Sequence, residues 1–176
     1  FSIDAVTNCD ITLIQKDKKF FRKGYQYSWA RILVAMKEPE GYRWIAGRYS
    51  QGKLTSIQCL LDPGKYFVIV MVDWAGDRSY DMRLNYSGNT EIQSLERVPQ
   101  TEASSILTET CIDLSQRFGE FRQLSPQLCS YWHIDNKLGM VIDNINNESE
   151  RSVQYHKSYE RTMRILTGLR GVNEGT

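Results

Sequence analysis

Apolar and polar residues alternate with the period of two that is typical of β-strands over the first half of the chain. The strongest signal is the apolar run 65–72, which follows the turn sequence Asp62-Pro63-Gly64. Pro63 fixes φ and Gly64 can adopt a positive φ, so we expect a turn at this point. The β-branched and aromatic residues that follow predict a buried strand.

Further strands are predicted at intervals of about 8–15 residues. They cover residues 9–15, 25–36, 42–47, 54–61 and 80–86, with a polar loop over 48–53. The last of them alternates most regularly and predicts a half-buried strand. Turn signals separate these segments and no helical pattern interrupts them. Residues 1–90 are therefore predicted to form an antiparallel β-sandwich.

The pattern changes to a helical one after this region. Apolar residues fall mostly at helical intervals between 101 and 122, at Ile106, Leu107, Ile112, Leu114, Phe118 and Phe121. Cap residues near 101–105 and Gly119 bound a helix predicted near 102–118. We expect its apolar stripe to contact a core, and we assign residues 91–127 to a connecting segment that contains this helix.

Residues 128–176 return to a β-like pattern. Alternation at Leu138, Met140 and Ile142 predicts a strand, and a polar turn rich in Asn and Glu follows at 144–150. Residues 152–166 fit a returning strand or a helix, and we prefer the strand. The predicted fold is thus mostly β: a β-sandwich, one helix, and a β-hairpin that opens an incomplete second sandwich.

Composition excludes several classes of protein. The 176-residue chain has a formal net charge of +1, which gives no global field for nucleic acid. No apolar run approaches the roughly 18 residues of a membrane span. The four cysteines form no CxxC pair and only two histidines occur, so we expect no zinc site. Two disulfides are compatible with four cysteines, but we expect reduced, buried thiols. Because the chain begins at Phe1, we expect it to be a piece of a longer polypeptide.

One segment concentrates basic and aromatic residues. It contains Lys16, Lys18, Lys19, Phe20, Phe21, Arg22 and Lys23. It is the candidate contact site for an anionic partner, such as phospholipid head groups, nucleic acid or an acidic protein tail. The alternative is a solvated loop whose two phenylalanines cap the core. We prefer this alternative because Asp17 interrupts the run and the rest of the chain is not basic.

Four segments together resemble the calpain-type β-sandwich, the non-catalytic domain that follows the protease core in calpains. They are Leu13-Ile14-Gln15-Lys16-Asp17, Tyr27 to Val34, Leu61-Asp62-Pro63-Gly64-Lys65-Tyr66 and Tyr80-Asp81-Met82-Arg83-Leu84-Asn85-Tyr86-Ser87. Their order and spacing cover residues 11–88. The stretch 139–144 is similar to the opening of the second sandwich in the tails of protozoan-type calpain-like proteins.

The resemblance raises the questions of catalysis and calcium. A calpain needs a nucleophilic Cys, a His and an Asn, with the Cys in a Gly-rich Asp-Cys-Trp context. None of the cysteines has such neighbours, and Cys129 with His133 is a poor triad signal, so we expect no enzyme activity in this chain. The acidic residues that could form a calcium loop are Glu38 and Glu40, and Asp73, Asp77 and Asp81. These acidic residues are few, and the basic Arg78 lies between Asp77 and Asp81. We therefore expect neither calcium nor another metal or cofactor.

The resemblance implies a non-catalytic structural or protein-interaction module within a larger cytoplasmic assembly. Its partners would be other proteins, and protozoan calpain-like scaffolds suggest the cytoskeleton or a cilium as its location. Nucleic acid and membranes are not expected as partners. One alternative is a regulatory domain fragment of an active calpain-family cysteine protease. The other is an anionic-lipid-binding module that uses the basic segment.

Overall fold

The computed structural model describes residues 1–75, 82–92, 96–125, 128–135 and 137–144. The chain divides into two compact units, Phe1–Ala103 and Ser104–Thr176. Each unit is described by itself.

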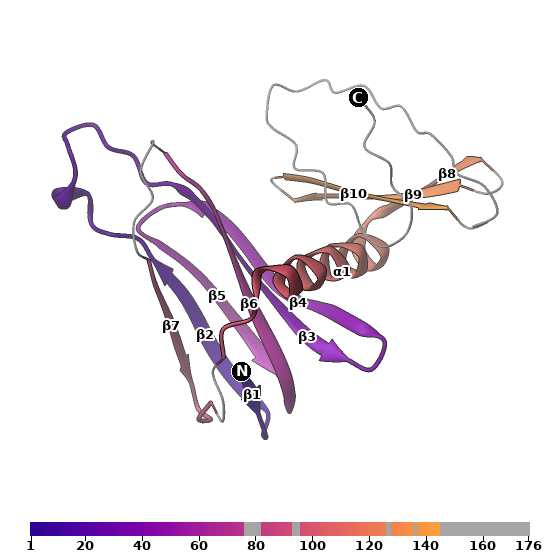
Figure 1. Cartoon of the computed structure of the whole chain (residues 1–176), viewed down its shortest axis with the longest axis horizontal. Coiled ribbons are helices and arrows are strands. Elements are labelled where there is room, and N and C mark those ends of the chain that lie inside the picture. Colours follow the sequence, from indigo (N-terminus) through magenta and orange to yellow (C-terminus); the bar gives the residue numbers. More distant parts are fainter. Residues whose placement is uncertain (76–81, 93–95, 126–127, 136, 145–176) are drawn as a thin grey trace. The chain divides into compact units, whose positions relative to one another are not determined.

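The first unit contains two antiparallel sheets (Figure 1). The four-stranded sheet has the order β1 (Ser2–Ile3), β6 (Gly64–Asp73), β3 (Trp29–Glu38) and β4 (Gly41–Gln51). The three-stranded sheet has the order β5 (Leu54–Leu61), β2 (Thr7–Ile14) and β7 (Arg83–Gly88). The predicted antiparallel sandwich is therefore confirmed.

The core lies between the inner faces of these two sheets. Ile11 and Leu13 on β2 pack in one cluster with Ile32 and Val34 on β3. The outer face of the smaller sheet is polar. On it, the Thr12 hydroxyl lies 2.8 Å from the Ser56 hydroxyl. This division into an apolar and a polar face explains the period of two in the sequence.

Two strand boundaries differ from the prediction. Strand β3 begins at Trp29 rather than Tyr25, because residues 15–28 form a loop closed at its base. Strand β4 continues through most of the predicted polar loop and ends at Gln51. Its polar residues fit because their backbone pairs with β3 and because the Ser50 hydroxyl lies 2.7 Å from the Thr55 hydroxyl.

The strand after the Asp-Pro-Gly turn is buried only at its start. Tyr66 and Phe67 are buried, but Val70 is 37% exposed. Gly64 does not take a positive φ, so that part of the prediction is wrong. A Cβ atom at this position would lie 2.7 Å from Cε of Met36, so the end of that flexible side chain would have to shift.

Strand β7 is also less buried than predicted. The chain enters the described strand at Arg83, and residues 80–81 of the predicted strand lie outside the described residues. Leu84 is 45% exposed, because among the described strands β7 pairs only with β2 and lies at the edge of its sheet.

The helix α1 (Gln100–Phe118) confirms the helix predicted near 102–118, and most of it belongs to the second unit. The three-stranded antiparallel sheet of this unit has the order β10 (Lys137–Asn144), β9 (Leu128–Asp135) and β8 (Glu120–Ser125). Strand β8 was not predicted, because Phe121 also fits the helical pattern that precedes it. Strand β10 forms a hairpin with β9, which precedes it. The predicted returning strand at 152–166 lies outside the described residues.

Candidate functional site: the basic aromatic loop

The basic segment of the sequence lies in a loop between β2 and β3 that is closed at its base by Gln15. Gln15 is only 2% exposed. Its Nε2 donates to the Ser28 carbonyl at 2.7 Å, and the Ser28 N–H donates to its Oε1 at 3.0 Å. The Gln15 N–H also donates to the carbonyl of Lys53 at 2.8 Å. The intervening residues 16–27, which we name the basic aromatic loop, therefore leave and rejoin the sandwich at one point.

A second tie at the base involves Asp17. Its Oδ2 lies 2.8 Å from Nζ of Lys53, and its Oδ1 accepts the N–H of Lys19 at 3.1 Å. The latter bond caps the short 3₁₀ helix η1 (Lys18–Phe20). The hydrogen bond from Lys53 lowers the pKa of Asp17 and raises that of Lys53. The one acidic residue of the loop is thus neutralised by a cation outside it.

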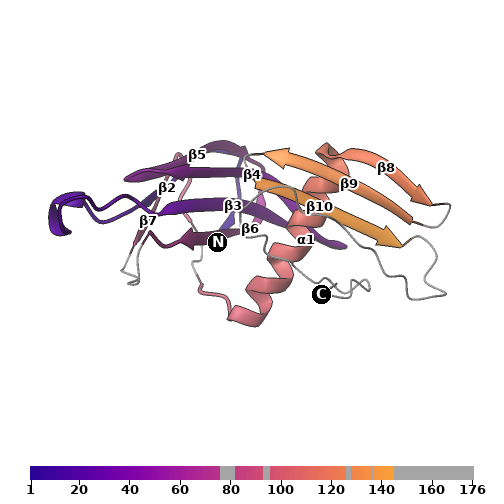
Figure 2. The same cartoon turned by 90° about the horizontal axis from the view of Figure 1, so that it is seen from above.

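The loop carries its positive charges in solvent. Five cations are exposed: Lys16, Lys18, Lys19, Arg22 and Lys23. Figure 2 shows that the loop extends beyond one end of the sandwich sheets. This placement separates its charges from the core and leaves them accessible to a large anionic partner.

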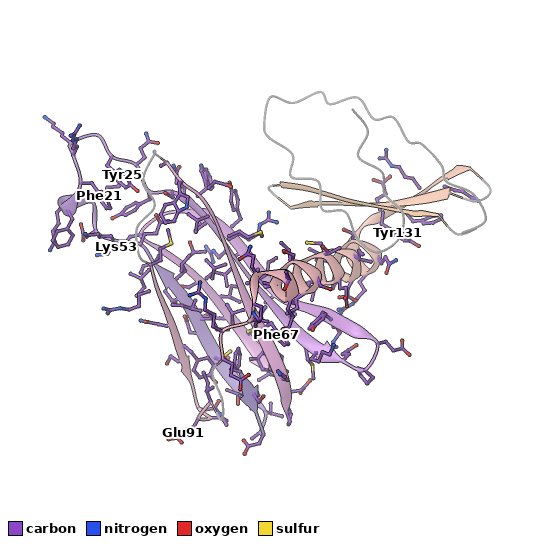
Figure 3. The ribbon with its side chains drawn as sticks, in the orientation of Figure 1. Phe21, Tyr25, Lys53, Phe67, Glu91 and Tyr131 are labelled. Atoms are coloured by element: carbon purple, nitrogen blue, oxygen red, sulfur yellow. The ribbon has the colours of Figure 1, made fainter. Side chains whose placement is uncertain are left out.

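The aromatic residues of the loop do not cap the core, so the structure contradicts that expectation. The Phe20 side chain is 63% exposed. Phe21 stacks on Tyr25 within the loop, with ring centroids 4.1 Å apart and an interplanar angle of 12°. Both labelled residues lie in the projecting loop in Figure 3, whereas Lys53 lies at its base. An exposed phenylalanine at the tip is a different feature from a core cap.

Lysine side chains lie over the aromatic rings of the loop. Nζ of Lys16 is 5.5 Å from the Phe20 ring centroid, and Nζ of Lys19 is 5.1 Å from it. Nζ of Lys18 is 4.7 Å from the Tyr27 centroid. These cation–π contacts hold the charged groups around the apolar tip.

The cations of the loop are evident in the sequence, but the contacts that build the loop are not. Tyr25 and Tyr27 alternate with polar residues, which is why they were assigned to a strand. Gln15 carried no sequence signal for its role, because a buried amide that closes a loop depends on a partner thirteen residues away.

The cysteines of the sandwich form a thiol pair rather than a catalytic centre. Cys9 and Cys59 are free thiols on neighbouring strands, with their Sγ atoms 3.6 Å apart. Burial raises the pKa of both thiols, that of Cys59 to about 12. This shift disfavours the nucleophilic thiolate. Cys129 and His133 both lie on β9.

Glu38 and Asp73, two of the acidic residues considered for calcium, do not lie together. Glu38 pairs with Arg43 at 2.7 Å and lies at the opposite end of β3 from the position that pairs with Asp73. Asp77 and Asp81 lie outside the described residues. In the part of the chain that the structure describes, no three His, Cys, Asp or Glu residues group as metal ligands. Within that part, no helix has the length and apolar character to cross a membrane.

Comparisons with known protein families, with curated proteins and with solved structures find no match for this chain. The resemblance to the calpain-type sandwich thus stays a prediction from the sequence segments.

Proposed function

We propose that this protein is a non-catalytic β-sandwich module that docks on anionic phospholipid surfaces through its basic aromatic loop. The observation that carries the proposal is the exposed Phe20 ring at the loop tip, with the amines of Lys16 and Lys19 over it. The proposal departs from the sequence-based expectation that membranes are not partners. The reason is that Phe20 projects into solvent instead of packing on the core.

An anionic membrane surface suits both the cations and the exposed aromatic ring of the loop. A basic residue held near an anionic leaflet contributes about 1 kcal/mol, and the loop presents five exposed cations. An aromatic ring with cationic neighbours suits the boundary between head groups and acyl chains, where the ring is buried and the amines reach phosphates. Because the loop is tied at its base, it loses little conformational entropy on docking.

The same contacts favour a membrane over nucleic acid. Binding of single strands relies on aromatic faces that are free to stack on bases. Here Phe21 stacks on Tyr25, and lysine amines lie over Phe20 and Tyr27. A stacked base would have to displace these intramolecular contacts, whereas insertion of the loop tip into a head-group layer would not.

Vesicle co-sedimentation of the full chain tests the proposal. We expect binding to phosphatidylcholine vesicles that contain phosphatidylserine, little binding to pure phosphatidylcholine, and release as salt is raised. The triple variant Lys16→Glu, Lys18→Glu and Lys19→Glu should abolish binding, and Phe20→Ala should weaken it.

A matched control changes three exposed cations elsewhere on the sandwich: Lys37→Glu, Lys65→Glu and Arg83→Glu. This control has the same net charge as the loop variant and should keep most of the binding. Equal loss in both triple variants, or equal binding to neutral and anionic vesicles, would contradict a specific role of the loop.

The second candidate is a scaffold that joins other proteins in a cytoplasmic assembly such as a cytoskeletal or ciliary complex. The exposed apolar side chains of Leu54 and Leu60 on β5 support a protein-pairing role. Affinity purification of the native polypeptide under mild conditions tests it, with a stoichiometric protein partner as the expected result. The third interpretation, a regulatory domain of a calpain-family protease, requires catalytic sequence outside this chain, and the intact mass and peptide map of the native polypeptide test it.

A further inference from the structure

Two cysteines of the sandwich lie directly opposite each other on neighbouring strands. Cys9 on β2 pairs in register with Cys59 on β5, and both are free thiols (Figure 1). Their Sγ atoms are 3.6 Å apart. Directly opposite residues of antiparallel strands project their side chains from the same face of the sheet. The strand register therefore holds these two thiols together, although fifty positions separate them in the chain.

The backbone geometry of such a pair is compatible with a disulfide. Directly opposite Cα atoms on antiparallel strands are about 4.5 or 5.5 Å apart, depending on the type of pair. Both separations lie within the range of about 4.4–6.8 Å that disulfides span. A bond of about 2.05 Å requires the two sulfurs to approach each other by about 1.5 Å. Side-chain rotation supplies most of this movement, and β5 has a neighbour on only one side in its sheet among the described strands, so it can shift slightly.

The surroundings of the two thiols differ in a way that orders their reactions. Cys9 is 3% exposed and belongs to the core cluster, whereas Cys59 is half-buried and packs against that cluster. Cys59 is therefore the more accessible thiol, and Cys9 is the nearest group that can attack an adduct formed on it. Burial raises the pKa of both thiols, so exchange in the native state is slow. This barrier affects the rate of oxidation and leaves its equilibrium to the geometry.

We infer that Cys9 and Cys59 are a site of reversible disulfide formation by exchange with a small disulfide such as oxidised glutathione. In the first step the Cys59 thiolate attacks one sulfur of the small disulfide, and the other sulfur leaves as a thiolate that takes up the proton. In the second step the Cys9 thiolate attacks Sγ of Cys59 and displaces the remaining small thiol. Two protein S–H bonds and one S–S bond are replaced by one protein S–S bond and two small thiols. Two electrons thus pass from the protein to the small disulfide.

The disulfide would fasten β2 to β5 within the sandwich. A cross-link across fifty positions restricts the unfolded chain strongly, and the stabilisation grows with the length of the closed segment. Because the disulfide stabilises the fold, the fold stabilises the disulfide by the same factor. The same two strands carry the base of the basic aromatic loop, where the Gln15 N–H donates to the Lys53 carbonyl. Oxidation would therefore strengthen the part of the sandwich on which the loop is mounted.

Equilibration of the full chain at pH 8 with graded amounts of oxidised glutathione, at a fixed concentration of reduced glutathione, tests the inference. One series starts from native reduced protein. The other starts from reduced protein that is unfolded in urea and refolded in the same buffers, so that slow exchange cannot conceal the equilibrium. Free thiols are then blocked with N-ethylmaleimide in urea. Trypsin cleaves after Lys16, Lys53 and Lys65, so Cys9 and Cys59 fall in different peptides, and we expect these peptides to be joined by a disulfide.

The amount of oxidised glutathione needed measures the effect of the fold. Half-oxidation of the folded chain should require at least about tenfold less oxidised glutathione than half-oxidation of the chain kept in urea, because the fold holds the thiols together. The oxidised protein should also unfold at a urea midpoint about 1 M or more above that of the reduced protein. Equal or easier oxidation in urea would overturn the inference.

A cysteine variant and a matched control identify the pair. In Cys59→Ala, Cys9 should remain a thiol or carry glutathione, whereas Cys111→Ala changes a half-buried thiol on α1 and should keep the cross-link. Circular dichroism establishes that each variant is folded, and the peptide map of the unaltered chain decides the question if Cys59→Ala is not. Absence of the cross-link in both series overturns the inference, and so does a cross-link that joins Cys9 mainly to Cys111 or Cys129. The result is independent of vesicle binding, which depends on the cations of the loop.

Discussion

The buried amide of Gln15 closes the base of the basic aromatic loop, and replacement by alanine isolates its contribution. The Gln15→Ala substitution removes the bond from Nε2 to the Ser28 carbonyl and the bond from the Ser28 N–H to Oε1. Ser28 is fully buried, so water does not readily replace these partners. Its hydroxyl also accepts the N–H of Ala75 at 3.0 Å, so the residue cannot easily move toward solvent.

The expected cost follows from the groups left without partners. One buried backbone N–H and one buried C=O lose their hydrogen bonds, at about 1–3 kcal/mol each. The free energy of unfolding should therefore fall by about 2–6 kcal/mol. With a urea dependence of about 1–3 kcal/mol per M, the unfolding midpoint should fall by about 1 M or more.

Urea unfolding followed by tryptophan fluorescence measures this change, because Trp29 is adjacent to Ser28. The matched control is Gln51→Ala, whose Nε2 donates to the Tyr27 carbonyl at 2.9 Å in an exposed position. Water can replace that bond, so the control should change stability by less than about 0.5 kcal/mol. If the two variants lose the same stability within that margin, the buried amide does not hold the loop base.

Four further predictions concern the sandwich and the base of its loop. Because burial raises the thiol pKa values of Cys9 and Cys59, that of Cys59 to about 12, iodoacetamide at pH 8 should modify both thiols more slowly than in the urea-unfolded chain, and Cys59 about a hundredfold or more slowly; equal rates by mass spectrometry would contradict this. The same raised pKa of Cys59 predicts that the stability due to its protonated state is present below about pH 9 and is lost between pH 9 and about 12, as pH-dependent urea midpoints would reveal. The pKa of Asp17 is lowered, so the tie to Lys53 should persist above the ordinary carboxyl pKa and be lost as pH falls through the lowered value, which amide exchange at Lys19 would report. Replacing the buried Ile11 with alanine should reduce the free energy of unfolding by about 2–5 kcal/mol, and a change below about 1 kcal/mol would show that this position is not part of a close-packed core.

Local patterns predicted those elements whose burial follows a simple period. Strands β2 and β5 appear close to their predicted bounds, because an inward apolar residue at every second position needs only a covered face. The helix α1 was found for the same reason at its own period. The pattern failed where alternation had another origin. Tyr25 and Tyr27 alternate with polar residues, yet they belong to a loop in which Tyr25 stacks on Phe21.

Sequence by itself therefore determined a β-rich chain with one helix, an apolar inner face and a cluster of cations between residues 16 and 23. Tertiary structure alone decided that this cluster projects from the sandwich. Gln15 meets Ser28 and Asp17 meets Lys53 only after β2, β3 and β5 have assembled. Tertiary structure also decided that, among the described strands, β7 pairs only with β2, so that Leu84 is 45% exposed although its strand alternates regularly. Which strand becomes a neighbour depends on the order of strands in the sheet, and residue periodicity does not encode that order.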